Sequence, residues 1–237
     1  MKIAAIYTSA TSQLISLIES ELRRALPDER PLHIMTRTDP SLLADTIQAG
    51  YVQAKTARSL LQMYLEAANA GADILYNVSM CMSDVAYETS NLFGMMGIRL
   101  VRIEELMADA ALELGSRIGI IATQRIAIDP LKRALQRSAE AGGKPLQTLD
   151  IWIEGAFGKT KDETTQMILA RAMPRQMEVD VFVLAQESLA LCERELDRKF
   201  IKPVLSAPHY GAMGVRQAVM AARRMRSIAA GGPGDTQ

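Results

Sequence analysis

Two stretches of the chain decide the expected fold: Asp73-Ile-Leu-Tyr-Asn-Val-Ser79 and Asp180-Val-Phe-Val-Leu-Ala-Gln186. Each is a short apolar run that begins at an aspartate after a helix-like segment and ends at a polar residue where another helix is expected. In an open α/β sheet, ligands bind at the carboxyl ends of parallel strands. The repeated unit therefore predicts two half-sites that face one cleft, with the function located between Ser79 and Gln186.

Strand and helix patterns alternate along the rest of the sequence with short connections. This alternation is typical of parallel sheets covered by helices, and its repetition in the second half of the chain predicts an α/β protein of two similar lobes. A long helical pattern ends at Gly71, as a C-terminal glycine favours, and Asp129-Pro130 is expected to open another helix. Besides the two quoted stretches, we expect strands at 3–7, 32–35, 98–103, 117–122, 146–153 and 204–206, and helices ending at 26, 96 and 142 and spanning 44–70, 104–114, 162–173, 189–200 and 211–225.

The composition is that of an ordinary globular protein and gives no sign of a nucleic-acid or membrane target. Of 237 residues, 49% are hydrophobic and 23% are charged, and 27 Lys and Arg balance 27 Asp and Glu, which does not favour nucleic acid or an acidic membrane. No apolar run approaches a membrane span or a signal peptide, so we expect a cytoplasmic protein. The two cysteines, Cys81 and Cys192, lack the spacing of a zinc or disulfide framework, so no metal is expected.

Several segments together resemble the aspartate/glutamate/hydantoin racemase superfamily, which includes arylmalonate decarboxylase and maleate isomerase. They are the two quoted stretches, Ile118-Gly-Ile-Ile-Ala-Thr123 and Lys202-Pro-Val-Leu-Ser-Ala-Pro208, and the similarity extends from Lys2 to about Ala222. The resemblance implies two flavodoxin-like lobes, a small carboxylate-bearing ligand in the cleft between them, no cofactor and often a homodimer. We expect a first lobe at 1–104 completed by a C-terminal helix at 208–228, a second lobe at 105–207 and a mobile tail at 229–237.

The resemblance fails at the two catalytic positions. Racemases of this family place a cysteine at each strand tip, and one thiolate removes the substrate's α-proton while the other thiol returns a proton from the opposite side. Here Ser79 and Gln186 stand at those two positions. A hydroxyl or an amide has no accessible pKa near neutrality, so neither can replace a thiolate as the base. Ordinary two-thiol racemization is therefore not expected.

Other residues near the strand tips can supply chemistry. Cys81, near an expected helix start, is either a relocated base or nucleophile with a lowered pKa or a packing residue. Glu187 is either an acid or base with a raised pKa or a cap of the next helix. His209 follows the last strand, in a segment that the family places near the cleft, and can act as an acid or base near neutral pH. The candidate catalytic residues are therefore Ser79, Cys81, Gln186, Glu187 and His209.

Neutral donors also gather at the expected strand ends, where they can hold a carboxylate or cap a helix. We expect ligand contacts among Thr8, Ser9, Asn77, Ser83, Thr123 and Tyr210.

Three functions remain open. The favoured one is a cofactor-independent isomerase, epimerase or decarboxylating lyase that acts on a small carboxylic, keto or sugar acid through a carbanion or enolate with altered catalytic groups. The second is a hydrolase or C–C lyase with Ser79 as nucleophile, activated by His209 or Glu187, although no GxSxG elbow is present. The third is a non-catalytic protein that binds a small carboxylate.

Overall fold

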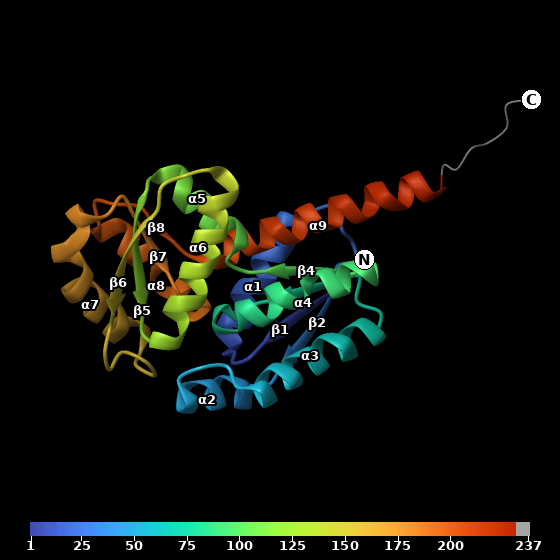
Figure 1. Ribbon diagram of the computed structural model, residues 1–237, viewed down its shortest axis with the longest axis horizontal. Coiled ribbons are helices and arrows are strands. Elements are labelled where there is room, and N and C mark those ends of the chain that lie inside the picture. The colour runs from blue at the N-terminus through green and yellow to red at the C-terminus, as the bar shows by residue number, and fades with distance from the viewer. Residues whose placement is uncertain (231–237) are drawn as a thin grey trace, which may run out of the picture.

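The computed structural model describes the backbone of residues 1–230 and the side chains of residues 1–225. In this part of the chain, two four-stranded parallel sheets have the same strand order, with the first strand of each half in the second position (Figure 1). The predicted α/β fold with two flavodoxin-like lobes is confirmed. The first sheet runs β2 (His33–Thr38), β1 (Lys2–Tyr7), β3 (Ile74–Asn77), β4 (Arg99–Arg102), and the second runs β6 (Gln147–Trp152), β5 (Arg117–Ala122), β7 (Val181–Leu184), β8 (Val204–Leu205).

Helices cover both faces of each sheet, and short 3-10 segments follow several strands (Figure 1). Three of these segments, η1 (Met80–Met82), η2 (Arg125–Ala127) and η4 (Glu187–Leu189), follow a strand tip and lead into a helix, whereas η3 (Met173–Glu178) follows a helix. The helices are α1 (Ser12–Ala25), α2 (Pro40–Ala49), α3 (Ala54–Asn69), α4 (Ser83–Met95), α5 (Glu105–Leu114), α6 (Ile128–Gly142), α7 (Lys161–Ala172), α8 (Ala190–Lys199) and α9 (Ala207–Ala230).

The two aspartates that open the quoted stretches have equivalent structural roles. Asp73 accepts a hydrogen bond of 2.7 Å from the backbone N–H of Lys2, at the start of β1. Asp180 accepts one of 2.9 Å from the backbone N–H of Arg117, at the start of β5, and also binds the Arg117 guanidinium. These hydrogen bonds from Arg117 lower the pKa of Asp180 to about 2. In each lobe the aspartate thus ties the amino end of the central strand to its neighbour, β3 or β7.

Alternating side chains of the central strands fill different cores, as the two-residue period of a strand requires. In β1, Ile3 and Ala5 belong to a buried apolar cluster that also takes in Ile118 and Ile120 of β5, whereas Ala4 belongs to a cluster on the outer side of the first lobe. One continuous core therefore joins the two lobes and holds their strand ends in a fixed relation.

Helix α9 begins in the second half of the chain and runs along the first lobe beside α1 (Figure 1). The division into lobes at 1–104 with 208–228 and at 105–207 stays a prediction. Of the tail predicted at 229–237, Ala229 and Ala230 belong to α9 and the rest lies outside the described residues.

Three helix boundaries differ from the sequence-based expectation. The helix expected at 44–70 is two helices, because Gly50 adopts a left-handed φ of 78° and caps the end of α2. Asp129 lies in the first turn of α6 rather than at its N-cap. The last helix begins at Ala207 rather than near 211, since Pro208 in the first turn lacks only an N–H that would have no helical partner.

Substitution Gly211→Ala should destabilise the contact between α9 and the first lobe. A Cβ at this position would overlap the Tyr76 hydroxyl oxygen and lie 2.8 Å from Cγ1 of Ile103. Overpacking of this kind costs about 1–3 kcal/mol of unfolding free energy. The matched control is Gly94→Ala within α4, where a Cβ has no neighbour within 4 Å and alanine favours the helix. Urea unfolding should show a loss for the first variant and none for the second. Equal stability of the two variants would contradict this packing.

Candidate functional site

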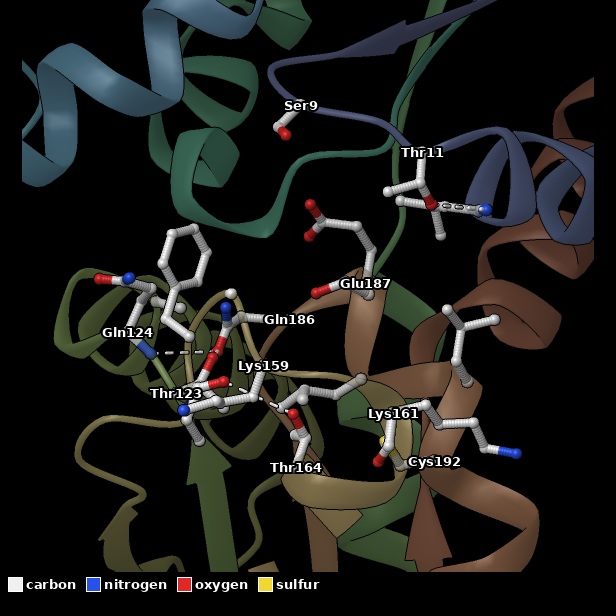
Figure 2. Close-up of a pocket in the computed structure, with 18 of the residues that line it drawn as sticks. Ser9, Thr11, Thr123, Gln124, Lys159, Lys161, Thr164, Gln186, Glu187 and Cys192 are labelled. Carbon is white, nitrogen blue, oxygen red and sulfur yellow. Dashed lines mark hydrogen bonds between the residues drawn. The ribbon is translucent and has the colours of Figure 1, made fainter. Parts of the chain in front are cut away.

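A cavity of about 420 Å³ lies where the strand ends of the two sheets face one another. Its lining combines the segment from β1 to α1 and η1 of the first lobe with three segments of the second lobe, those that follow β5, β6 and β7. The cavity thus occupies the place expected from the two quoted stretches. Figure 2 shows Ser9 and Thr11 on one side and Thr123, Gln186 and Glu187 on the other.

Glu187, directly after the tip of β7, points toward the first lobe (Figure 2). Glu187 is the first residue of η4, and its Oε2 lies 3.5 Å from the backbone nitrogen of Met80 in η1. Burial raises the pKa of Glu187 to about 7, with a smaller contribution from the charge of Glu104. The carboxyl group is therefore suited to exchange protons near neutral pH.

Cys81 reaches the same cavity from the first lobe, and two hydroxyls lie behind it. The oxygens of Thr8 and Ser79 share a hydrogen bond of 2.5 Å, and the Ser79 hydroxyl lies 3.1 Å from the Cys81 sulfur. Burial and the charge of Glu187 raise the pKa of Cys81 to about 12, although the hydrogen bonds oppose this. The expected lowering by a helix N-terminus is wrong, because Cys81 is buried in a three-residue 3-10 turn. The group is a thiol at neutral pH.

Ser79 itself does not line the cavity. It is 1% exposed, and its hydroxyl contacts Thr8 and Cys81 rather than a histidine or a carboxylate. This environment supplies no base to activate a serine nucleophile. Thr8 is likewise buried behind the lining, whereas Ser9 lines the cavity.

Gln186 and Thr123 both line the cavity, but they bind each other. The amide oxygen of Gln186 accepts hydrogen bonds from the Thr123 backbone N–H (2.6 Å), the Thr123 hydroxyl (2.9 Å) and the Gln124 backbone N–H (3.2 Å). Thr123 was expected to hold a ligand carboxylate, and here its donors hold a side chain of the protein instead. Gln186 has no group that can remove a proton from carbon.

Asn77 and Ser83 flank η1 in the buried interior and do not line the cavity. Asn77 accepts a hydrogen bond from the Tyr64 hydroxyl and donates one of 2.9 Å to the carbonyl oxygen of Ser79. Ser83 donates to Glu104, whose pKa is raised by burial. Both residues are fully buried, so their role in the structure is to fix the turn that carries Cys81.

The structure does not bring His209 and Tyr210 to the cavity. Both lie in the first turns of α9, because that helix begins earlier than expected. The His209 side chain is 61% exposed, with Nδ1 3.4 Å from Oε2 of Glu21 on α1. Neither residue is part of the lining.

Sequence reasoning missed the loop between β6 and α7. Phe157, Lys159 and Thr160 of this loop and Lys161 at the start of α7 line the cavity, as does Gln124 after β5. The available signal was the polar, glycine-containing run that follows a predicted strand end, at the same edge as the other tips. Among the side chains of residues 1–225, no cluster of three His, Cys, Asp or Glu could hold a metal ion.

Comparison with known proteins identifies similar families and folds. The family model described as Asp/Glu/Hydantoin racemase matches residues 3–213. Similar solved structures include glutamate racemase isoform RacE1 from Bacillus anthracis (TM-score 0.70, 16% identity, 93% of this chain and 82% of that chain) and aspartate racemase from Picrophilus torridus (0.64, 11%, 94% and 95%). Allantoin racemase from Klebsiella pneumoniae is also similar (0.61, 12%, 93% and 88%). At these identities the likeness shows a shared fold. No curated protein sequence gives a match.

Proposed function

Because the chain belongs to the Asp/Glu/hydantoin racemase family, we propose that it is a cofactor-independent enzyme acting on a small carboxylic, keto or sugar acid through a carbanion or enolate. The reaction is an isomerization, an epimerization or a decarboxylation, and the proton-transfer groups are Glu187 and Cys81 in place of the two tip cysteines. The observation that carries the proposal is that these two residues line one cavity from different lobes, with the pKa of Glu187 raised to about 7.

Glu187 is the base in this proposal. A general base works best when its pKa lies near the operating pH, because it is then ionised in part and still basic enough to accept a proton from carbon. Burial provides this match for Glu187. In an isomerization, the carboxylate takes the proton of the substrate's α-carbon and the electron pair of the C–H bond moves into the enolate.

Cys81 is the proton donor. Since the charge of Glu187 contributes to the raised pKa of Cys81, proton uptake by Glu187 removes that charge and lowers the pKa of the thiol. Proton capture on one wall of the cavity therefore eases proton donation from the other. The S–H proton passes to the carbanion carbon, and the resulting thiolate keeps its hydrogen bond to Ser79. In a decarboxylation, the same thiol protonates the carbon that has lost carbon dioxide.

The other functions and properties expected from the sequence have less support from the structure. No observation favours the hydrolase, since Ser79 is outside the lining and has no adjacent base. Within the described residues, no helix has both the length and the apolar character needed to span a membrane. The homodimer and the cytoplasmic location stay predictions.

Proton NMR of the purified protein in D₂O tests the proposed function. The protein is treated with a chelator and incubated with a panel of amino, hydroxy, keto, dicarboxylic and sugar acids. We expect solvent deuterium at a substrate carbon, or conversion of a substrate, without any added cofactor. Ligand line broadening with neither exchange nor conversion would contradict the proposal and favour a binding protein. Conversion that depends on an added metal or organic cofactor would also contradict it.

A further inference from the structure

The amide group of Gln186 is held in one orientation. The atom that faces Thr123 and Gln124 lies 2.6 Å and 3.2 Å from two backbone nitrogens, which can only donate hydrogen bonds. That atom must therefore be the amide oxygen, and the Thr123 hydroxyl donates to the same oxygen. Three donors on one acceptor prevent the amide from turning over, so the position of its nitrogen is fixed as well.

The amide nitrogen of Gln186 is a donor directed into the cavity. Figure 2 shows it turned away from the Thr123 and Gln124 backbone, and within the described part of the chain no hydrogen bond engages it. Gln186 as a whole is 9% exposed, but its amide nitrogen is not one of the fully buried side-chain atoms that lack a partner, so this nitrogen faces the solvent of the cavity. A ligand oxygen that replaces water at this nitrogen meets a donor whose direction is already fixed, which reduces the entropic cost of binding.

The charge around this donor favours an oxyanion as the acceptor. Glu187 is the only acidic residue among the described residues that line the cavity, and its negative charge is lost when it accepts a proton. When Glu187 accepts a proton, negative charge develops on the enolate oxygen of the substrate. Once the substrate has displaced water from the site, a fixed N–H stabilises such a charge without reorganisation.

The rest of the lining has few charged side chains that could bind a second charged group of the ligand. Among the described residues, the lining contains no arginine. The Lys159 ammonium lies 3.9 Å from the carboxylate of Glu163. Lys161 extends away from Gln186 in Figure 2. Much of the remaining surface is aliphatic or aromatic, contributed by Leu14, Leu43, Ile126, Phe157, Leu189 and Leu191.

We propose that Gln186 is the fixed hydrogen-bond donor to the carboxylate or enolate oxygen of the substrate, and that the substrate is a carboxylic acid with an apolar group on its α-carbon. This inference rests on the proposed function and names the substrate class of the same cavity. It gives Gln186 a role that differs from proton transfer: the residue binds and stabilises the oxyanion while Glu187, next in the chain, exchanges the proton.

Calorimetric titration of the full chain tests this inference through binding rather than turnover. The ligands are 2-phenylpropanoate and 2-methylbutanoate, compared with aspartate and glutarate. Gln186→Glu keeps the oxygen that Thr123 and Gln124 bind but replaces the N–H donor with a second anionic oxygen. We expect the two apolar acids to bind the wild type at least tenfold more tightly than the dicarboxylates, and the variant to lose at least tenfold in affinity for them. The control is Gln147→Glu, which adds the same charge at the exposed amino end of β6 and should bind as the wild type does.

A second measurement needs no variant. In a ¹H–¹⁵N spectrum of the wild type, the side-chain NH₂ signals of Gln186 should shift on addition of 2-phenylpropanoate. Unshifted Gln186 signals, unchanged affinity in a folded Gln186→Glu, tighter binding of the dicarboxylates, or no binding by either apolar acid would each overturn the inference. Binding as expected without deuterium exchange on any acid would refute the proposed function alone. Deuterium exchange at the same rate in Gln186→Glu and in the wild type would refute this inference alone.

Discussion

Substitution Glu187→Gln is expected to slow deuterium incorporation into the substrate by about 10²- to 10⁴-fold, the range typical for loss of a general base. Glutamine preserves the size of the side chain and can still accept a hydrogen bond from Met80, but it cannot take a proton from carbon. The fold should be unaffected, because Glu187 is a half-buried cavity residue and belongs to none of the apolar cores. The rate is measured by NMR in D₂O with any acid that the wild type exchanges.

The pH dependence of the same reaction tests whether Glu187 acts in its ionised form. A base must be ionised to act, so kcat/KM of the wild type should rise with pH through the pKa of Glu187, at about 7. The residual rate of Glu187→Gln should lack this rise. Glu88→Gln, at an exposed position on α4, is the control and should keep both the rate and the profile. A Glu187→Gln enzyme with the wild-type rate would exclude Glu187 as the base.

Substitution Cys81→Ala is expected to reduce product formation by about 10²-fold or more, since it removes the acid on the opposite wall. Exchange of the substrate proton at Glu187 should persist, because deprotonation and return of the proton on that side do not need the thiol. The variant should therefore incorporate deuterium with retention of configuration while it fails to invert.

Cys192→Ala provides a close control for this result. Cys192 is also a buried free cysteine that lines the cavity, but it lies in α8 with its sulfur 3.8 Å from the carbonyl oxygen of Lys161. Its removal should change the rate by less than the removal of Cys81. If Cys81→Ala inverted the substrate at the wild-type rate, this result would show that another group donates the proton.

The sequence predicted the framework well because its signals are local and repeated. The aspartate that begins each quoted stretch, the apolar strand and the polar tip recur in both halves, and the structure places Gln186 and, two residues after the first tip, Cys81 in the lining of one cavity. The break at Gly50 was missed because the helical pattern continues on both sides of that glycine, whose left-handed φ of 78° ends α2.

The site was less predictable, because its bonds join residues that are distant in sequence. The contact of Gln186 with Thr123 spans 63 positions, and that of Glu187 with Met80 spans 107 positions. No local pattern reports either contact. From sequence, Glu187 is equally suited to the start of a helix, and its contact with η1 across the cavity is visible only in the structure. The expectation for His209 failed for a related reason, since one earlier turn of α9 directs that residue onto α1.

The most direct measurement is a ¹³C NMR titration of the Glu187 side-chain carboxyl, assigned by the signal that disappears in Glu187→Gln. It requires no substrate. We expect an apparent pKa of about 7, well above the usual value of about 4.3 for a glutamate. A Glu187 that titrates in the ordinary range would be fully ionised and weakly basic at neutral pH, and this result would contradict its role as the base.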